Sequence, residues 1–401
     1  MGAMRVGFIG TGKKPEKPGP LGYGMAHQHA AAYKSLGGQV EIVAVADISR
    51  ENAEAFCGMF GVDPAKVYTD YPKMLKNEKL DLVSICTWPR LHAPMAIACA
   101  KAGVKGVYCE KPMADDFGSA RKMHETCARL GTRLGFNHQR RYGRPFRQAR
   151  KLIDEGAIGK LQQVQFTCGD IYDYGTHSID LSNYLAGEQR AKWVLAQIDY
   201  TQAKVIFGMH CENQAVVIWE YENGVMGFGA TGPGRPLVNA HNRAVGSEGI
   251  VEVGPFEQGE HPTQLRIRRF GQGGWEYLDC GGEHCHGPGY IERAIGDFVA
   301  CLRDGRPCEL ESGAAMRATE IIFGAYESSR RRARIELPPK LTDNPLVAMV
   351  EAGDLKPAGW TPAPKPKAAK KQARAAKKAK KPAKKKPAKQ KAAKKKAGRR
   401  K

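Results

Sequence analysis

The stretch Arg5-Val6-Gly7-Phe8-Ile9-Gly10-Thr11-Gly12 decides the fold predicted for this chain. A short apolar run ends in glycines, and a helical stretch from Met25 to Leu36 follows a loop rich in Lys, Pro and Gly. Strand, glycines and helix occur in this order at dinucleotide sites, where glycines permit a tight turn and close approach of the backbone to a pyrophosphate. Taken alone, the motif fits an ordinary glycine-rich turn equally well.

The next apolar run, Val40 to Ala46, ends in Asp47. A carboxylate at this place can bind both hydroxyls of an adenosine ribose and repels a 2′-phosphate, so NAD is favoured over NADP. The separation from Gly10 is longer than usual because residues Lys13 to Leu21 look like an insertion, which leaves either Gly22 or Gly24 as the third glycine. The predicted cofactor residues here are Gly10, Thr11, Gly12, Gly24 and Asp47.

Strand-like and helix-like stretches continue to alternate beyond Asp47, with further strands predicted at Leu82 to Cys86, Gly106 to Cys109 and Arg133 to Phe136. These strands, interleaved with helices, predict an α/β fold with a doubly wound parallel sheet. We assign this Rossmann domain to residues 1–137.

The loops that follow these strands carry reactive side chains. Ligands of open α/β sheets bind at the carboxyl ends of the strands, so these residues are candidates for cofactor or substrate contacts. After Val107-Tyr108-Cys109 come Glu110, Lys111 and Pro112, and the proline stops further strand pairing. The remaining candidates are Thr87, Pro89 and His92 after the predicted strand Leu82 to Cys86, and Asn137, Arg140 and Arg141 after the last strand. The alternatives are a packing histidine at 92 and a solvated linker face at 140–141.

From Arg144 the pattern changes to one amphipathic helix followed by several β-type runs with little helix between them. Asn223-Gly224 between two of these runs is a hairpin signal. Helices are predicted again at Gly289 to Arg303 and Gly313 to Arg330. We therefore predict a second α+β domain over 138–345, with a largely antiparallel open sheet and helices on one face. The other face needs cover, which a partner subunit can supply.

Asp173 and His177 stand four residues apart at a predicted helix start. Both side chains can then project from one side, and the carboxylate can orient the imidazole. The alternative is an N-terminal capping acid beside a packing histidine.

The formal charge of +22 is concentrated in the last residues of the chain. Residues 356–401 hold 21 of the 63 Lys and Arg and no Asp or Glu, so residues 1–355 hold 42 basic and 41 acidic side chains. A Lys/Ala/Pro-rich segment cannot form a core, and we expect a disordered tail at 356–401. It is either a solvated tail or a salt-dependent, non-specific binder of nucleic acid or another polyanion.

The eleven cysteines are scattered through apolar segments, a pattern typical of reduced intracellular thiols. No apolar run is long enough for a membrane span and no signal-peptide core is present, so we expect a cytoplasmic protein. The segment Cys280 to His286 contains soft metal ligands, but its spacing fits no standard zinc finger and we predict no metal.

Five elements together resemble the Gfo/Idh/MocA oxidoreductases, the glucose-fructose oxidoreductase and inositol dehydrogenase family. They are Gly10-Thr11-Gly12, His29 to Tyr33, Val43 to Asp47, Glu110-Lys111-Pro112, and Asp173 to Asp180. The resemblance covers roughly residues 5–337. It implies NAD(P)-dependent hydride transfer to or from a secondary alcohol or ketone of a sugar, cyclitol or related polyol, by a homodimer or homotetramer.

By position, the resemblance implies that Lys111, Asp173 and His177 are catalytic. His177 would be the proton acceptor, Lys111 would stabilise the developing alkoxide and Asp173 would fix the histidine. Arg141, Asn137 and His177 would contact substrate, and Glu110 and Lys111 would border the cofactor. Two other functions stay open: an NAD-dependent glycoside hydrolase of the same family, and a nucleotide-binding protein tethered to nucleic acid by the basic tail.

Overall fold

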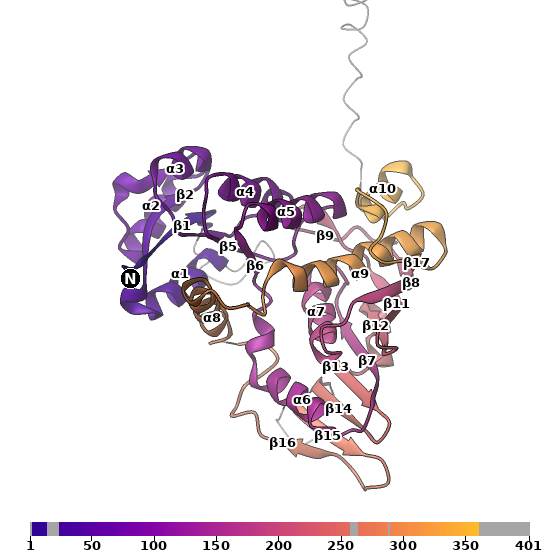
Figure 1. Ribbon diagram of the computed structural model, residues 1–401. Helices are drawn as coiled ribbons and strands as arrows, with labels where there is room; N and C mark the ends of the chain where they lie inside the picture. The colour runs from indigo at the N-terminus through magenta and orange to yellow at the C-terminus, as the bar shows by residue number, and fades with distance from the viewer. Residues whose placement is uncertain (1, 14–23, 257–263, 288, 361–401) are drawn as a thin grey trace, which may run out of the picture. The chain divides into compact units, whose positions relative to one another are not determined.

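The computed structural model describes residues 2–13, 24–256, 264–287 and 289–360 (Figure 1). It confirms the predicted α/β architecture, a parallel sheet followed by a mostly antiparallel mixed sheet. Most of the predicted insertion at Lys13 to Leu21, and residues 361–401 of the tail predicted at 356–401, lie outside the described residues. Residues 356–360 are described, and the Ala358 amide donates a hydrogen bond to the Thr201 carbonyl at 2.7 Å, so these five residues do not behave as the predicted disordered tail.

The first sheet has six parallel strands in the order β3-β2-β1-β4-β5-β6. Val6 and Phe8 are fully buried, as expected for a parallel sheet covered on both faces. The two-residue strand β3 was not among the predicted runs. The strands are β1 (Met4–Ile9), β2 (Val40–Ala46), β3 (Val67–Tyr68), β4 (Leu82–Ile85), β5 (Gly106–Cys109) and β6 (Arg133–Phe136).

Helices connect these strands, and two of the helices begin at side-chain caps. The Ser49 side chain accepts a hydrogen bond from the amide of Asn52 at the start of α2, and Asp116 does the same for Ser119 in α5. Pro89 occupies the first turn of α4, where its missing N–H costs nothing. The helices are α1 (Met25–Ser35), α2 (Arg50–Phe60), α3 (Tyr71–Asn77), α4 (Pro89–Lys101) and α5 (Phe117–Arg129).

The second sheet has nine strands in the order β16-β15-β14-β13-β7-β12-β11-β8-β17. Among the described strands of this sheet, only the β7–β12 pair is parallel. The predicted hairpin at Asn223-Gly224 is confirmed between β11 and β12, with Gly224 at a φ of 81°. The strands are β7 (Leu161–Cys168), β8 (Ala191–Asp199), β11 (Gln214–Tyr221), β12 (Met226–Thr231), β13 (Ala240–Gly246), β14 (Gly249–Pro255), β15 (Leu265–Arg269), β16 (Glu276–Leu278) and β17 (Ile335–Glu336).

Strands β9 (Val205–Ile206) and β10 (Met209–His210) form a separate small hairpin. Neither they nor β13 and β16 were predicted. Helices α7 (Gly175–Leu185) and α9 (Ser312–Arg331) pack against the large sheet, and every residue of α7 is buried. Helices α6 (Arg144–Asp154) and α10 (Pro345–Ala352) complete the second half of the chain.

Helix α8 (Tyr290–Asp304) follows the second sheet in sequence but packs against the first (Figure 1). The Phe298 ring lies 5.2 Å from the Tyr108 ring of β5. A methyl group on Gly135 of β6 would come within 2.5 Å of Phe298, and one on Gly106 of β5 within 2.5 Å of Leu302. These glycines therefore let the helix approach the strands closely. The core of the first sheet thus includes residues from beyond position 289.

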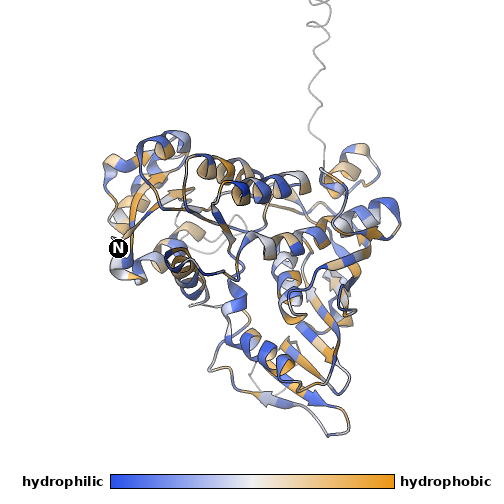
Figure 2. Ribbon diagram, viewed as in Figure 1, coloured by the Kyte–Doolittle hydropathy of each residue, from blue (hydrophilic) through white to orange (hydrophobic). Residues whose placement is uncertain are grey.

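Hydrophobic residues are frequent along the strands, whereas hydrophilic residues are frequent on helices such as α5 and α6 (Figure 2). This is the pattern of sheets buried beneath amphipathic helices. In the described part of the chain, no helix combines the length and the apolar character needed to cross a membrane.

Candidate active site

The glycine turn after β1 packs tightly against the end of β4. Gly10 has a φ of 83°, and its amide donates a hydrogen bond to the carbonyl of Ala46 at 2.8 Å. A Cβ atom at Gly10 would lie 2.7 Å from the carbonyl oxygen of Cys86 and from the Thr87 side chain. Only glycine fits both the backbone conformation and the space, as the predicted dinucleotide turn requires.

Asp47 lies at the carboxyl end of β2 and faces the same turn. Its Oδ2 atom accepts hydrogen bonds from the amides of Thr11 at 2.7 Å and Gly12 at 3.3 Å, and from the Thr11 hydroxyl at 3.0 Å. Its Oδ1 atom accepts from the Ser49 amide at 2.8 Å. The structure therefore brings Gly10, Thr11, Gly12 and Asp47 together.

Helix α1 begins directly after Gly24, which has a φ of 58°. Gly24 has no side chain with which to cap the helix, and the first turn contains no acidic residue. The free amides and positive dipole end of such a helix favour a phosphate group. The turn, Asp47 and the start of α1 fit a dinucleotide, with backbone amides for the pyrophosphate and a carboxylate for the ribose.

The loop after β4 is fixed by His92, which is fully buried. Its Nδ1 atom lies 2.9 Å from the Pro112 carbonyl oxygen and its Nε2 atom 3.0 Å from that of Thr87. Burial lowers the pKa of His92 despite these carbonyls. His92 therefore joins the loops that contain Thr87, Pro89 and Lys111, which corresponds to the alternative of a packing histidine.

Glu110 anchors a buried polar network below these loops. Its Oε1 atom lies 2.9 Å from His29 Nε2 and accepts a hydrogen bond from the Asn137 side chain at 2.7 Å. Asn137 in turn accepts from the Tyr108 hydroxyl at 2.9 Å, and His29 Nδ1 lies 2.8 Å from the Ser84 hydroxyl. Burial opposes ionisation of Glu110, but His29, Lys111 and Asn137 together keep its pKa below the usual value. Asn137 is thus engaged inside the network rather than turned toward a substrate.

Lys111 meets Asp173 at the boundary between the two sheets. Lys111 Nζ donates to Asp173 Oδ1 at 2.9 Å and to the Asp173 carbonyl at 3.2 Å, and both side chains are less than one-fifth exposed. The Asp173 amide is held by Asp170 Oδ1 at 2.6 Å, and Asp170 itself pairs with Lys204 at 2.8 Å. The second domain therefore presents a fixed carboxylate to the lysine of the first.

His177 lies in the first turn of α7 and is 4% exposed. Burial, the charges of Arg140 and Lys111, and the neighbouring His138 and His241 hold the pKa of His177 well below its usual range. Its Nδ1 atom has no hydrogen-bond partner among the described residues.

The predicted contact between Asp173 and His177 is wrong. Helix α7 begins at Gly175, so Asp173 precedes the helix, and its carboxylate turns to Lys111 instead. The four-residue spacing positions two side chains on one face only when both residues are helical.

Arg141 is buried in an ion pair. Its Nε and Nη2 atoms donate to the two carboxylate oxygens of Asp180, each at 2.7 Å, and Nη1 donates to Glu188. Burial raises the pKa of Asp180. The electrostatic effects of Arg141 and His138 together outweigh burial and keep this pKa below its usual value. The alternative of a solvated linker face is wrong for both arginines, since Arg140 is 5% and Arg141 1% exposed.

Several residues surround His177, and of these sequence reasoning named Arg140 but missed Tyr174, His138 and His241. The Arg140 guanidinium carbon lies 4.5 Å from the centre of the Tyr174 ring, and its Nη1 atom is 2.7 Å from His241 Nε2. The His138 ring lies 5.6 Å from that of His177. His241 comes from β13, a strand with no clear alternating pattern, so the sequence carried no signal for it.

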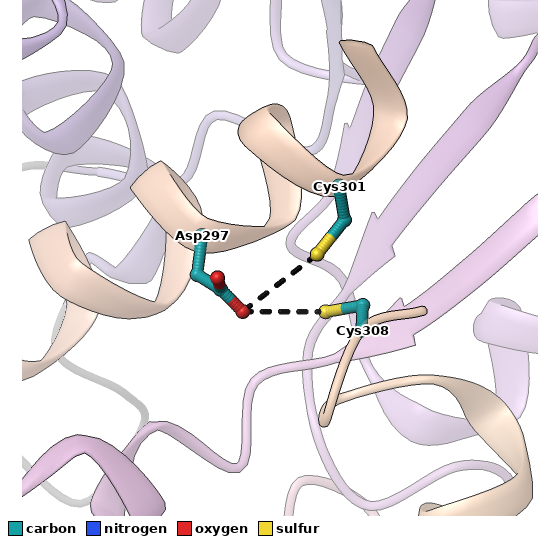
Figure 3. A group of neighbouring side chains, drawn as sticks. All are labelled: Asp297, Cys301 and Cys308. Atoms are coloured by element: carbon teal, nitrogen blue, oxygen red, sulfur yellow. Dashed lines mark hydrogen bonds between the residues drawn. The ribbon is translucent and has the colours of Figure 1, made fainter. Parts of the chain in front are cut away.

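Asp297, Cys301 and Cys308 form a group of potential metal ligands (Figure 3). Both thiols donate to Asp297 Oδ2 at 3.8 Å, and Tyr142 donates to the same oxygen at 2.5 Å. Burial raises the pKa of both thiols, and Arg306 pairs with the other Asp297 oxygen. The group is a hydrogen-bonded contact between α8 and the neighbouring loops.

Two cysteines of the segment Cys280 to His286, for which we predicted no metal, form hydrogen bonds with different residues. Cys280 Sγ donates to Gln148 Oε1 at 3.3 Å, whereas Cys285 Sγ donates to Gln264 Oε1 at 3.4 Å.

Comparison with known proteins agrees with this geometry. Residues 4–138 match the family model of an oxidoreductase family with an NAD-binding Rossmann fold, and residues 159–337 match the model of its C-terminal alpha/beta domain. The chain belongs to the Gfo/Idh/MocA oxidoreductase family. The resemblance stated from the sequence is confirmed, and the protein is an NAD-binding oxidoreductase.

Several Gfo/Idh/MocA relatives span most of the chain. Myo-inositol 2-dehydrogenase of Thermotoga maritima is 25% identical over 352 residues, 83% of this chain and 98% of the relative. D-apiose dehydrogenase of Paraburkholderia graminis is 24% identical over 360 residues, 82% and 91% of the two chains. An inositol dehydrogenase homologue from Azotobacter vinelandii, solved with NADH and myo-inositol, has a TM-score of 0.66 at 20% identity, covering 84% of this chain and 98% of that one.

Proposed function

We propose that this protein is an NAD-dependent dehydrogenase of a sugar, cyclitol or related polyol, acting on one CH–OH carbon or on the corresponding ketone. The observation that carries the proposal is the Lys111–Asp173 pair at 2.9 Å, next to the buried His177 and at the carboxyl edge of the dinucleotide sheet. Relatives named for inositol and apiose support the same substrate class.

The residues divide the proton chemistry between them. When bound, the nicotinamide takes up or supplies the hydride. His177 is neutral at pH 7 because its pKa is depressed, so it can accept the proton that the substrate hydroxyl loses. Lys111 donates a hydrogen bond to the developing alkoxide, and Asp173 holds the lysine amine in place.

The preference for NAD over NADP rests on Asp47. Its carboxylate lies beside the glycine turn, where a 2′-phosphate would meet a negative charge at short range. Binding of NADH and NADPH to the same preparation, measured by nicotinamide fluorescence, tests this preference. Equal affinities would contradict it.

A screen of sugars and polyols with NAD, read at the nicotinamide absorbance band, tests the reaction. We expect steady NADH accumulation with at least one polyol. Product release without NADH accumulation would instead identify the glycoside-cleaving chemistry of the family. Lys111→Ala should abolish turnover while NAD still binds, and unchanged turnover would rule out this site.

We also propose a homodimer or homotetramer joined through the outer face of the large sheet. Leu195 of β8 is 44% exposed, and Val216, Ile218 and Phe228 on neighbouring strands are only partly buried. An apolar sheet face of this kind is a common oligomer interface. Ile218→Glu should dissociate the oligomer in size-exclusion chromatography with light scattering, and an unchanged mass would contradict the interface.

Two further proposals concern location and the tail. We infer a cytoplasmic location, supported by eleven cysteines that are all free in the structure; cell fractionation with immunodetection tests it. We infer that residues 356–401, with 21 positive charges, add non-specific polyanion binding to the enzyme rather than replacing its activity.

A further inference from the structure

Arg140 is a buried cation without an acidic partner. It follows β6 and is 5% exposed, and its side chain makes one hydrogen bond to the described residues, from Nη1 to His241 Nε2 at 2.7 Å. Among the described residues no carboxylate oxygen lies within 4.0 Å of its guanidinium nitrogens, and its Nε atom has no partner. Buried charges are normally paired, because an unpaired one loses its hydration without compensation.

The contacts of Arg140 do not neutralise its charge. Burial and the charge of Arg140 lower the pKa of His241 to about 3, so His241 is neutral. Its Nδ1 atom lies 2.6 Å from the Asn242 side-chain oxygen, which leaves Nε2 as the acceptor for Arg140. Tyr174 offers the face of its ring, a weak partner compared with a carboxylate. The guanidinium is thus held in place with its charge unbalanced.

The adjacent arginine shows what the free edge of such a group binds. Arg141 uses Nε and Nη2 to hold the two oxygens of Asp180, each at 2.7 Å. In Arg140 the same Nε–Nη2 edge makes no hydrogen bond to the described residues. This edge matches the geometry of a carboxylate, which accepts two parallel hydrogen bonds.

The free edge belongs to the candidate active site. The positive charges of Arg140 and Lys111 both lower the pKa of His177. Tyr174, whose ring contacts the Arg140 guanidinium, directly follows Asp173 in the chain. Lys111 already has a countercharge in Asp173, so the site has one positive charge left to balance. One carboxylate supplies one negative charge, whereas a phosphate supplies about two.

We propose that Arg140 binds a carboxylate group of the substrate, so that the polyol oxidised or reduced here is a sugar acid. This inference rests on the proposed dehydrogenase function for the substrate class, but carboxylate binding can be measured without turnover. The same carboxylate would reduce the positive field at His177 and favour its role as proton acceptor.

The test is a binding comparison of matched acid and neutral probes on the full chain loaded with NADH. D-glucuronate is compared with D-glucose, D-galacturonate with D-galactose, and D-gluconate with D-glucitol, by calorimetry and by thermal shift. We expect at least one acid to bind the wild type at least tenfold more tightly than its neutral partner. Equal affinities in every pair, or no binding of any acid, would overturn the proposal.

Variants assign the preference to Arg140. Arg140→Gln should abolish the preference for acids while NADH affinity stays unchanged. Arg140→Lys keeps the charge but not the two parallel N–H donors, so it should retain part of the preference for acids. Arg144→Gln is the matched control, because Arg144 is exposed and faces Glu283. Retention of the full preference in a folded Arg140→Gln variant would overturn the proposal. If acids bind selectively but no probe is oxidised or reduced, the proposed reaction fails and the carboxylate site stands.

Discussion

Lys111 Nζ lies 2.9 Å from Asp173 Oδ1, so the amine in the loop after β5 is held by a carboxylate from the second domain. The pair is less than one-fifth exposed, which limits screening by water and salt. The position of the lysine therefore depends on both halves of the chain.

The first prediction concerns this pair. Asp173→Asn keeps an oxygen acceptor but removes the countercharge, so we expect kcat to fall roughly 10²-fold, as for loss of one transition-state contact. Steady-state kinetics and NADH titration measure the effect, with NADH affinity expected to stay constant. Lys105→Met is the control, because Lys105 is 76% exposed and pairs with Asp81. An equal loss in the control variant would show that the effect is not specific to the site.

The second prediction concerns the pH dependence of turnover. Because the pKa of His177 lies well below 6.5, the neutral base persists as the pH falls through 6.5. The acid limb of kcat/KM should therefore lie below pH 6.5. A limb at pH 6.5 or above that His177→Gln removes would contradict the depressed pKa.

The third prediction concerns stability in acid. His241 has a pKa of about 3 in the folded chain and an ordinary value of 6.5 when exposed, so between these pH values the unfolded state binds a proton that the folded state does not. The resulting contribution of His241 to the free energy of unfolding is complete above pH 6.5. It is lost as the pH falls toward 3, at up to about 1.4 kcal/mol per pH unit. His241→Gln should flatten the pH dependence of urea unfolding over this range. His284→Gln should not, because His284 is exposed and its charge is not among the causes of the shift at His241.

The fourth prediction concerns the buried network at Glu110. Glu110→Ala leaves His29 and Asn137 without their shared acceptor, and removal of one partner from a buried pair costs about 3–5 kcal/mol. Chemical denaturation should show this loss. Glu125→Ala, at an exposed glutamate that pairs with Arg121 on α5, should change stability by less than about 0.5 kcal/mol.

The fifth prediction concerns the basic tail. Deletion of residues 356–401 should remove most affinity for duplex DNA and the steep dependence of that affinity on salt, because those residues hold 21 positive charges. Turnover should stay unchanged. Fluorescence anisotropy at several salt concentrations measures the DNA affinity and its dependence on salt. Unchanged DNA affinity after deletion would show that the tail is not the anchor.

The sequence predicted what depends on local pattern. The buried strands β1, β2, β4, β5 and β6, the glycine turn and the Asn223-Gly224 hairpin all follow from short-range signals, and the structure confirms them. Strand β3, with two residues, is too short to give a pattern. Strand β13 mixes His241, Asn242 and Arg243 with small residues, because its side chains serve partners from α7 and the turn after β6.

The sequence predicted which residues form the candidate site better than it predicted the contacts between them. The residue types of Lys111, Asp173 and His177 marked the chemistry, but the choice of partner depends on where α7 begins. Adjacent arginines look equivalent in sequence, yet Asp180 pairs with Arg141 and leaves Arg140 without an acid. Such differences are set by tertiary contacts between residues that are distant in the chain.

Helix α8 closes the core of the first sheet although the chain reaches it only at Tyr290, after eight strands of the second sheet and the small hairpin β9–β10. During synthesis the first 137 residues therefore emerge without the helix that covers Tyr108 and Gly135. Domains that are complete in sequence can fold while the rest of the chain is still being made. The first domain cannot finish folding until residue 304 has left the ribosome, so the nascent chain exposes an apolar face that chaperones can bind while residues 138–304 are being made.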